Sequence, residues 1–140
     1  MDMADVTNRV VHFEISASDP ARAAKFYQAV FGWDIQKWEG GSMPYWMVMT
    51  GKGAVEGAIN GGILQREGEA PANSAPTKGY VCIVEVADVD GVVKKITENG
   101  GKITKPAYDL PQVGRLAYAI DIEGNTFGVI KSIPRTGSPV

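Results

Sequence analysis

Two side chains that could exchange a proton lie close together near the start of the chain. His12 is the only histidine, and Glu14 follows it by two residues. Alternate residues of a strand point to the same side, so His12, Glu14 and Ser16 would share one face. An imidazole beside a carboxylate can act as acid and base. As metal ligands the pair is weak, because tight sites use three or four ligands.

Both residues also have an ordinary structural interpretation. His12 could be a hydrogen-bonded interior histidine without a role in binding. Glu14 could form a salt bridge with a lysine or arginine, since a carboxylate inside a protein needs a partner.

The other reactive residue types are explained by structural roles. Cys82 is the only cysteine, so neither a disulfide nor a CxxC zinc site can form, and we expect a buried structural thiol. Asp88 and Asp90 resemble a carboxylate pair, but they are better explained as a helix cap and a first-turn acid. The sequence has no nucleophile elbow, P-loop or GxGxxG motif.

Composition excludes several classes of partner. The chain has 140 residues, a hydrophobic content of 44% and a formal net charge of -2, which is typical of one globular domain. Without a basic patch, neither nucleic acid nor an anionic membrane is expected as a partner. The first ten residues do not form a signal peptide, and no apolar run is long enough for a membrane span. A reducing, cytoplasmic location is expected.

The elements that must position these residues occur twice. Asp19 and Asp88 lie 69 residues apart, as do Ile15 and Val84. Each copy begins with a strand pattern, followed by an aspartate-capped helix that ends at glycine. The predicted first strands are 10–16 and 80–86, and the later strands are 34–38, 45–50 and 58–64 in the first copy and 102–107, 115–120 and 126–132 in the second. We therefore predict a single domain, 1–140, with βαβββ modules at 10–64 and 80–133 and a connector at 65–79.

This repeat resembles the vicinal oxygen chelate superfamily, which includes glyoxalase I, fosfomycin and bleomycin resistance proteins, extradiol dioxygenases and methylmalonyl-CoA epimerase. The resemblance implies an α+β fold in which the two modules form an open curved mixed sheet around a cavity, with the helices outside. The matching residues extend from about 10 to 131 and comprise Val11-His12, Asp19 and the segments 26–33, 61–63, 86–90, 99–101 and 121–128.

The same resemblance implies a metal-ligand place at His12, but the other ligand places do not match. Val81 and Gly128 occupy two of them, and none of the residues 60–62 is a carboxylate. Valine and glycine side chains cannot donate an electron pair to a cation. We therefore expect no cofactor. The alternative is a divalent metal, although Val81 and Gly128 do not support one.

The resemblance also implies that the polar side of the first strand faces the cavity, together with Tyr118 from the second module. The repeat spacing and strand alternation extend this side to further residues. Core packing is the alternative for Tyr118 and the methionines. The predicted ligand-binding set is His12, Glu14, Tyr45, Met47, Met49, Leu116 and Tyr118.

Two functions follow from this set. The first is a protein that binds a small organic molecule in the inter-module cavity without metal. The alternative is a lyase, isomerase or dioxygenase-type enzyme that uses His12 and Glu14 as catalytic residues, with or without a divalent metal. A homodimer is expected, because Trp33, Trp38 and Trp46 offer more aromatic surface than one small core requires.

Overall fold

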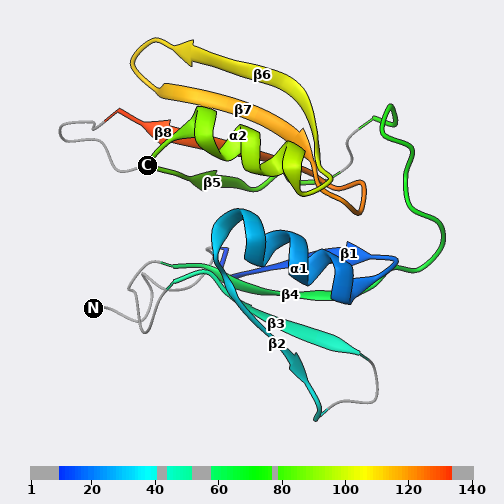
Figure 1. Ribbon diagram of the computed structural model, residues 1–140. Helices are drawn as coiled ribbons and strands as arrows, with labels where there is room; N and C mark the ends of the chain where they lie inside the picture. Colours follow the sequence, from blue (N-terminus) through cyan, green and yellow to red (C-terminus); the bar gives the residue numbers. More distant parts are fainter. Residues whose placement is uncertain (1–9, 41–43, 52–57, 77–78, 134–140) are drawn as a thin grey trace.

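The computed structural model describes residues 10–40, 44–51, 58–76 and 79–133 as two successive βαβββ modules. The predicted α+β fold of two modules with open mixed sheets is confirmed (Figure 1). No helix among the described residues is long and apolar enough to cross a membrane. The first module comprises β1 (His12–Ala17), α1 (Pro20–Phe31), β2 (Asp34–Trp38), β3 (Tyr45–Met49) and β4 (Asn60–Gln65), and the second comprises β5 (Ile83–Glu85), α2 (Val89–Glu98), β6 (Lys102–Leu110), β7 (Gly114–Ile120) and β8 (Thr126–Ser132).

Each module forms its own four-stranded sheet. The strand orders are β1-β4-β3-β2 and β5-β8-β7-β6. In both sheets the first strand pairs in parallel with the last strand of its module, and the other pairs are antiparallel. Each helix packs against one face of its own sheet, which leaves the opposite face for other contacts.

The helix ends follow the predicted capping chemistry. Asp19 accepts a hydrogen bond from the Arg22 amide at 3.2 Å, and Asp88 accepts one from the Gly91 amide at 3.1 Å. At the end of α1, Gly32 takes φ of 71°, a left-handed conformation that suits glycine. These local contacts fix where the chain turns from helix to strand.

The first strand of the second module is shorter than predicted. The prediction covered 80–86, but β5 spans only three residues and pairs with β8 alone. Cys82 therefore precedes the strand and is exposed, which corrects the prediction of a buried thiol. The physical reason is that no described strand covers the other edge of β5, so alternation alone does not bury its flanking residues.

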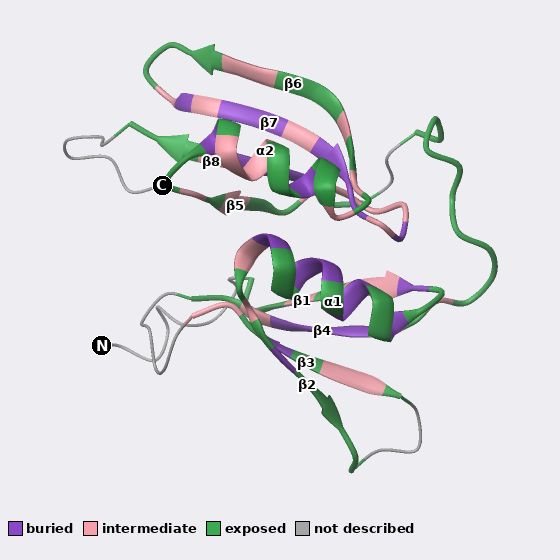
Figure 2. Ribbon diagram, in the orientation of Figure 1, coloured by how far each residue is buried: buried purple, intermediate pink, exposed green. Residues whose placement is uncertain are grey.

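A shared apolar core joins the modules. Phe127 of β8 packs edge-on against Phe26, Tyr27 and Phe31 of α1, with ring centroids 5.9–6.2 Å apart. Figure 2 shows buried residues on the inner side of both helices and along β4, β7 and β8. Trp33 stacks on Tyr27 at 5.3 Å and so joins the same core from the first module.

Candidate functional site

The face of the first sheet that is turned away from α1 carries most of the predicted site. Core residues such as Phe13, Ile63 and Val48 alternate along the strands with residues of the opposite face. We call this opposite face the shelf. Its twelve residues are His12, Glu14, Ser16, Asp34, Gln36, Trp38, Tyr45, Met47, Met49, Asn60, Gly62 and Leu64.

A tyrosine lies across the centre of the shelf. Gly62 pairs with Glu14 on β1 and with Met47 on β3. A Cβ atom at Gly62 would overlap the Tyr45 hydroxyl, so the missing side chain makes room for the phenol. The Tyr45 Oη lies 3.0 Å from His12 Nε2. His12, Glu14 and Tyr45 therefore form one polar cluster.

The electrostatics of this cluster keep the phenol protonated. Burial, and then the Glu14 carboxylate nearby, raise the pKa of Tyr45 above its usual value. Tyr45 can therefore donate a hydrogen bond at neutral pH, and the charge on this part of the shelf lies on Glu14.

Around the polar cluster the shelf exposes apolar side chains. Met47 and Met49 are 40% and 41% exposed, and Trp38 is 48% exposed. The Trp38 ring stands edge-on to Tyr45, with centroids 6.2 Å apart. This gathering of large exposed apolar groups distinguishes the shelf from the ordinary surface of a soluble protein, where such groups are usually scattered singly.

Leu116 and Tyr118, the two predicted residues from the second module, lie on the corresponding face of the second sheet. The Tyr118 ring lies over Gly128, where a Cβ atom would come within 3.0 Å of the ring. Leu116 is buried and pairs across β6 and β7 with Tyr108. Among the described residues, no hydrogen bond or ring contact links Tyr118 to His12 or Glu14. The structure thus brings His12, Glu14, Tyr45, Met47 and Met49 together on the first sheet and places Leu116 and Tyr118 on the second sheet, without direct contact between the two groups.

An open groove of about 1770 Å³ lies between the modules. We call it the inter-module groove. It is bordered by β1 and β5, the outer strands of the two sheets, and its apolar lining includes Phe31, Trp33 and Ile83. Glu14 and Met49 line the groove as well as the shelf, so the two surfaces meet there.

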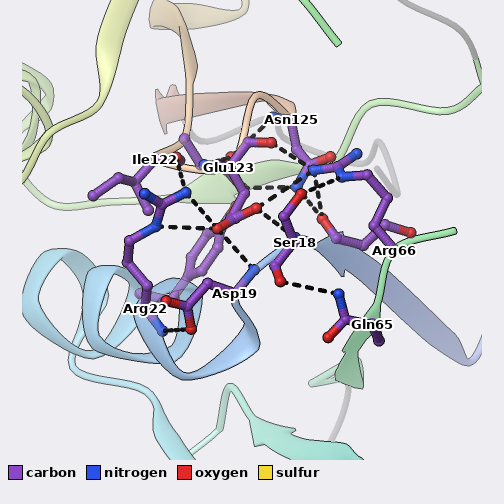
Figure 3. Close-up of polar contacts among 11 residues, drawn as sticks. Ser18, Asp19, Arg22, Gln65, Arg66, Ile122, Glu123 and Asn125 are labelled. Carbon is purple, nitrogen blue, oxygen red and sulfur yellow. Dashed lines mark hydrogen bonds and ion pairs between the residues drawn. The ribbon is translucent and has the colours of Figure 1, made fainter. Parts of the chain in front are cut away.

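Sequence reasoning missed the polar residues that join the modules beside this groove. The Glu123 side chain is completely buried in the turn between β7 and β8. Its carboxylate accepts hydrogen bonds from Arg22 Nη2 and the Ser18 amide, both at 2.6 Å, and from the Asp19 amide at 3.2 Å (Figure 3). Arg66 lies 3.7 Å from the same carboxylate. We call these residues the inter-module clamp.

The inter-module clamp also fixes the end of the shelf strand β1. Arg66 Nη2 and Asn125 Nδ2 donate hydrogen bonds to the Ser16 carbonyl, at 3.1 Å and 2.8 Å. In the sequence, Glu123 falls only within the matching segment 121–128, and Arg66 falls in the predicted connector at 65–79. No local pattern could have paired them, because the contacts span 50 to 109 residues.

The residues at the implied metal-ligand places do not fit a divalent cation. The Tyr45 hydroxyl fills the space above Gly62, and the Tyr118 ring fills the space above Gly128. The Asn60 Oδ1 is engaged by the Thr50 amide at 2.9 Å. Within the part of the chain that the structure describes, no three His, Cys, Asp or Glu side chains are grouped closely enough to hold a metal ion. His12 is left as the only matching ligand.

Comparisons with known proteins agree with the fold. A sequence profile described as the Glyoxalase/Bleomycin resistance protein/Dioxygenase superfamily matches residues 9–129. A glyoxylase-like domain-containing protein of Didymella fabae is 32% identical over 117 residues, covering 83% of this chain and 88% of that protein. The putative glyoxylase CFP32 of Mycobacterium tuberculosis is 30% identical over 118 residues, covering 83% of this chain but only 42% of that protein.

A solved structure gives the same result in three dimensions. TnmS3, an antibiotic binding protein from Streptomyces sp. CB03234, superposes with a TM-score of 0.61 at 22% identity, covering 91% of this chain and 98% of that chain. At this identity the likeness concerns the fold. Together with the profile match, it shows that the chain belongs to the glyoxalase/bleomycin resistance protein/dioxygenase superfamily.

Proposed function

We propose that this chain binds a small, partly apolar organic molecule where the shelf meets the inter-module groove, without using a metal. The observation that carries the proposal is the exposed set of Trp38, Met47 and Met49 around the hydrogen-bonded His12 and Tyr45. Ligand sites combine apolar surface with a few polar groups that fix orientation, and this surface has both. The fold of TnmS3, an antibiotic binding protein, supports the same class of function.

A second candidate is an enzyme of lyase, isomerase or dioxygenase type, with His12 and Glu14 as catalytic residues. The observation that favours it is the 3.0 Å contact between His12 Nε2 and Tyr45 Oη beside Glu14. Such a group could move a proton to or from a bound substrate. Chemical change of a bound compound, lost in the Glu14→Gln variant while binding persists, would favour the enzyme.

A metabolite library screened by thermal shift, followed by calorimetry on the hits, tests the binding function. A ligand at 100 times its Kd stabilises the folded protein by about 2.7 kcal/mol. We expect His12→Ala and Tyr118→Phe each to weaken a hit about tenfold while the protein stays folded, because each removes one polar contact. Chelator treatment should leave the affinity unchanged.

The two variants also distinguish binding on the shelf alone from binding that includes the Tyr118 face of the second sheet. If His12→Ala weakens binding and Tyr118→Phe does not, the ligand lies on the shelf alone. If neither variant weakens any hit, the site assignment is wrong. An affinity that disappears with chelation would contradict binding without metal.

We also propose that the chain forms a homodimer in the cytoplasm. Trp33 and Trp46 pack against the core of their own chain, so of the three tryptophans only Trp38 supports this proposal directly. Edge strands β1 and β5 also each have one side that no other described strand pairs with, and proteins usually cover such edges. Light scattering at micromolar concentration should give about twice the chain mass of 15.0 kDa, and the mass of one chain would contradict the dimer.

A further inference from the structure

We propose that the ligand is an organic cation, with its charged group beside Glu14 and a flat apolar body over the methionines of the shelf. This inference rests on the proposed binding function and deepens it, because it assigns the chemical class of the ligand.

The shelf carries acidic but no basic side chains. Of its twelve residues, only Glu14 and Asp34 are acidic, and none is lysine or arginine. Asp34 accepts a hydrogen bond from Gln36 Nε2 at 3.2 Å. The exposed carboxylate of Glu14 makes no hydrogen bond or ion pair with any residue that the structure describes. Its negative charge is therefore available to a ligand.

The adjoining inter-module groove is also lined by more acidic than basic side chains. Its described lining contains three carboxylates, on Glu14, Asp34 and Glu85, and one guanidinium, on Arg66. The Arg66 guanidinium is committed to the inter-module clamp through the Ser16 carbonyl, the Glu123 carbonyl and the Glu123 carboxylate. An anionic ligand would therefore find no free cation in this lining.

The apolar surface around Glu14 consists of aromatic and thioether side chains. Trp38 and Tyr45 present aromatic rings, and aromatic faces attract ammonium and guanidinium groups. Met47 and Met49 add polarizable side chains that adapt to flat ligands. A carboxylate next to exposed aromatic and thioether groups is complementary to a molecule that is both cationic and apolar.

The charge on the second sheet indicates which sheet the cationic group of the ligand faces. Lys105 lies on the same face as Tyr118, with its Nζ 4.4 Å from the centre of the Tyr108 ring. Positive charge on this face disfavours a second cation there. The cationic group of the ligand is therefore assigned to the shelf rather than to the face around Tyr118.

Three naphthalene probes of matched size test the proposal by calorimetry on the full chain. They are naphthylmethyl trimethylammonium, naphthylmethanol and naphthylmethanesulfonate. We expect the ammonium probe to bind at least about tenfold more tightly than the alcohol, and the sulfonate to bind most weakly. Glu14→Gln should abolish the preference for the cation. The matched control Glu98→Gln removes one exposed carboxylate on α2 and should preserve the preference.

The outcomes separate this inference from the proposed function. Equal or tighter binding of the alcohol or sulfonate overturns the cation assignment, while binding of small molecules stands. An equal loss of preference in Glu98→Gln and Glu14→Gln also overturns it, because the effect would then follow net charge rather than the shelf. If neither the probes nor the metabolite library yields a ligand, the binding function itself is wrong.

Discussion

Replacing Glu123 by alanine is expected to lower the free energy of unfolding by about 3–5 kcal/mol. The completely buried carboxylate accepts hydrogen bonds from Arg22 and from the Ser18 and Asp19 amides. Without it, the Ser18 and Asp19 amides lose their acceptor, and Arg22 and Arg66 lose their ion-pair partner, although the Arg66 side chain is only 10% exposed. Removing one member of a buried charged network costs more than the network contributes as a whole, because the remaining charge stays desolvated.

Urea denaturation measures this effect, with two further variants as references. Glu123→Gln keeps an acceptor oxygen but not the charge, so its free energy of unfolding should fall between those of the parent and Glu123→Ala. If the alanine variant does not fold, the glutamine variant provides the test. Glu98→Gln alters an exposed pair with Lys94 and should change stability by at most about 0.5 kcal/mol. A loss below about 1 kcal/mol in Glu123→Ala would show that the inter-module clamp does not stabilise the fold.

Tyr27→Phe is expected to destabilise the protein by about 1–3 kcal/mol at neutral pH. The buried Tyr27 hydroxyl donates a hydrogen bond to Asp121 Oδ2 at 2.5 Å. The substitution keeps the aromatic contacts with Phe26, Trp33 and Phe127. It leaves the buried Asp121 Oδ2 with a single hydrogen-bond donor, Asn125 Nδ2 at 3.1 Å. The cost therefore comes from the hydrogen bond rather than from packing.

The same residue gives a pH dependence with a defined sign. Burial, and then the Asp121 carboxylate, raise the pKa of Tyr27 well above its ordinary value of 10.0. The phenol of the unfolded chain ionises near pH 10, while that of the folded protein stays protonated. The stability that this group provides is complete below about pH 10 and is lost as the pH rises further.

Stability curves at pH 7 to 11 for the parent and Tyr27→Phe test this prediction. The difference between the two proteins should shrink above pH 10, because only the parent loses stability through this phenol. Tyr80→Phe is the matched control, since Tyr80 is fully exposed, and its difference from the parent should stay near zero throughout. A difference that stays constant up to pH 11 would contradict the raised pKa of Tyr27.

The sequence by itself determined the repeated part of this protein. The repeat spacing of 69 residues is visible in the sequence itself, and the caps at Asp19 and Asp88 and the glycine stop at Gly32 depend on contacts within a few residues of each other. Strand alternation then placed His12 and Glu14 on one face of β1. The family resemblance and the repeat spacing placed Tyr45 and the methionines on the same side of β3, which β4 separates from β1. Within one strand this is predictable because backbone geometry alone decides which side chains share a side.

The tertiary structure decided how separate segments meet. Glu123 became a buried partner of Arg22 and Arg66, Tyr45 reached His12 across Gly62, and Cys82 became exposed beside a short strand. No periodicity encodes these results, because each depends on where another strand or module packs. Contacts across about 100 residues, such as those of Glu123 with α1, are selected by the fit of whole elements, and that fit exists only once the chain has folded.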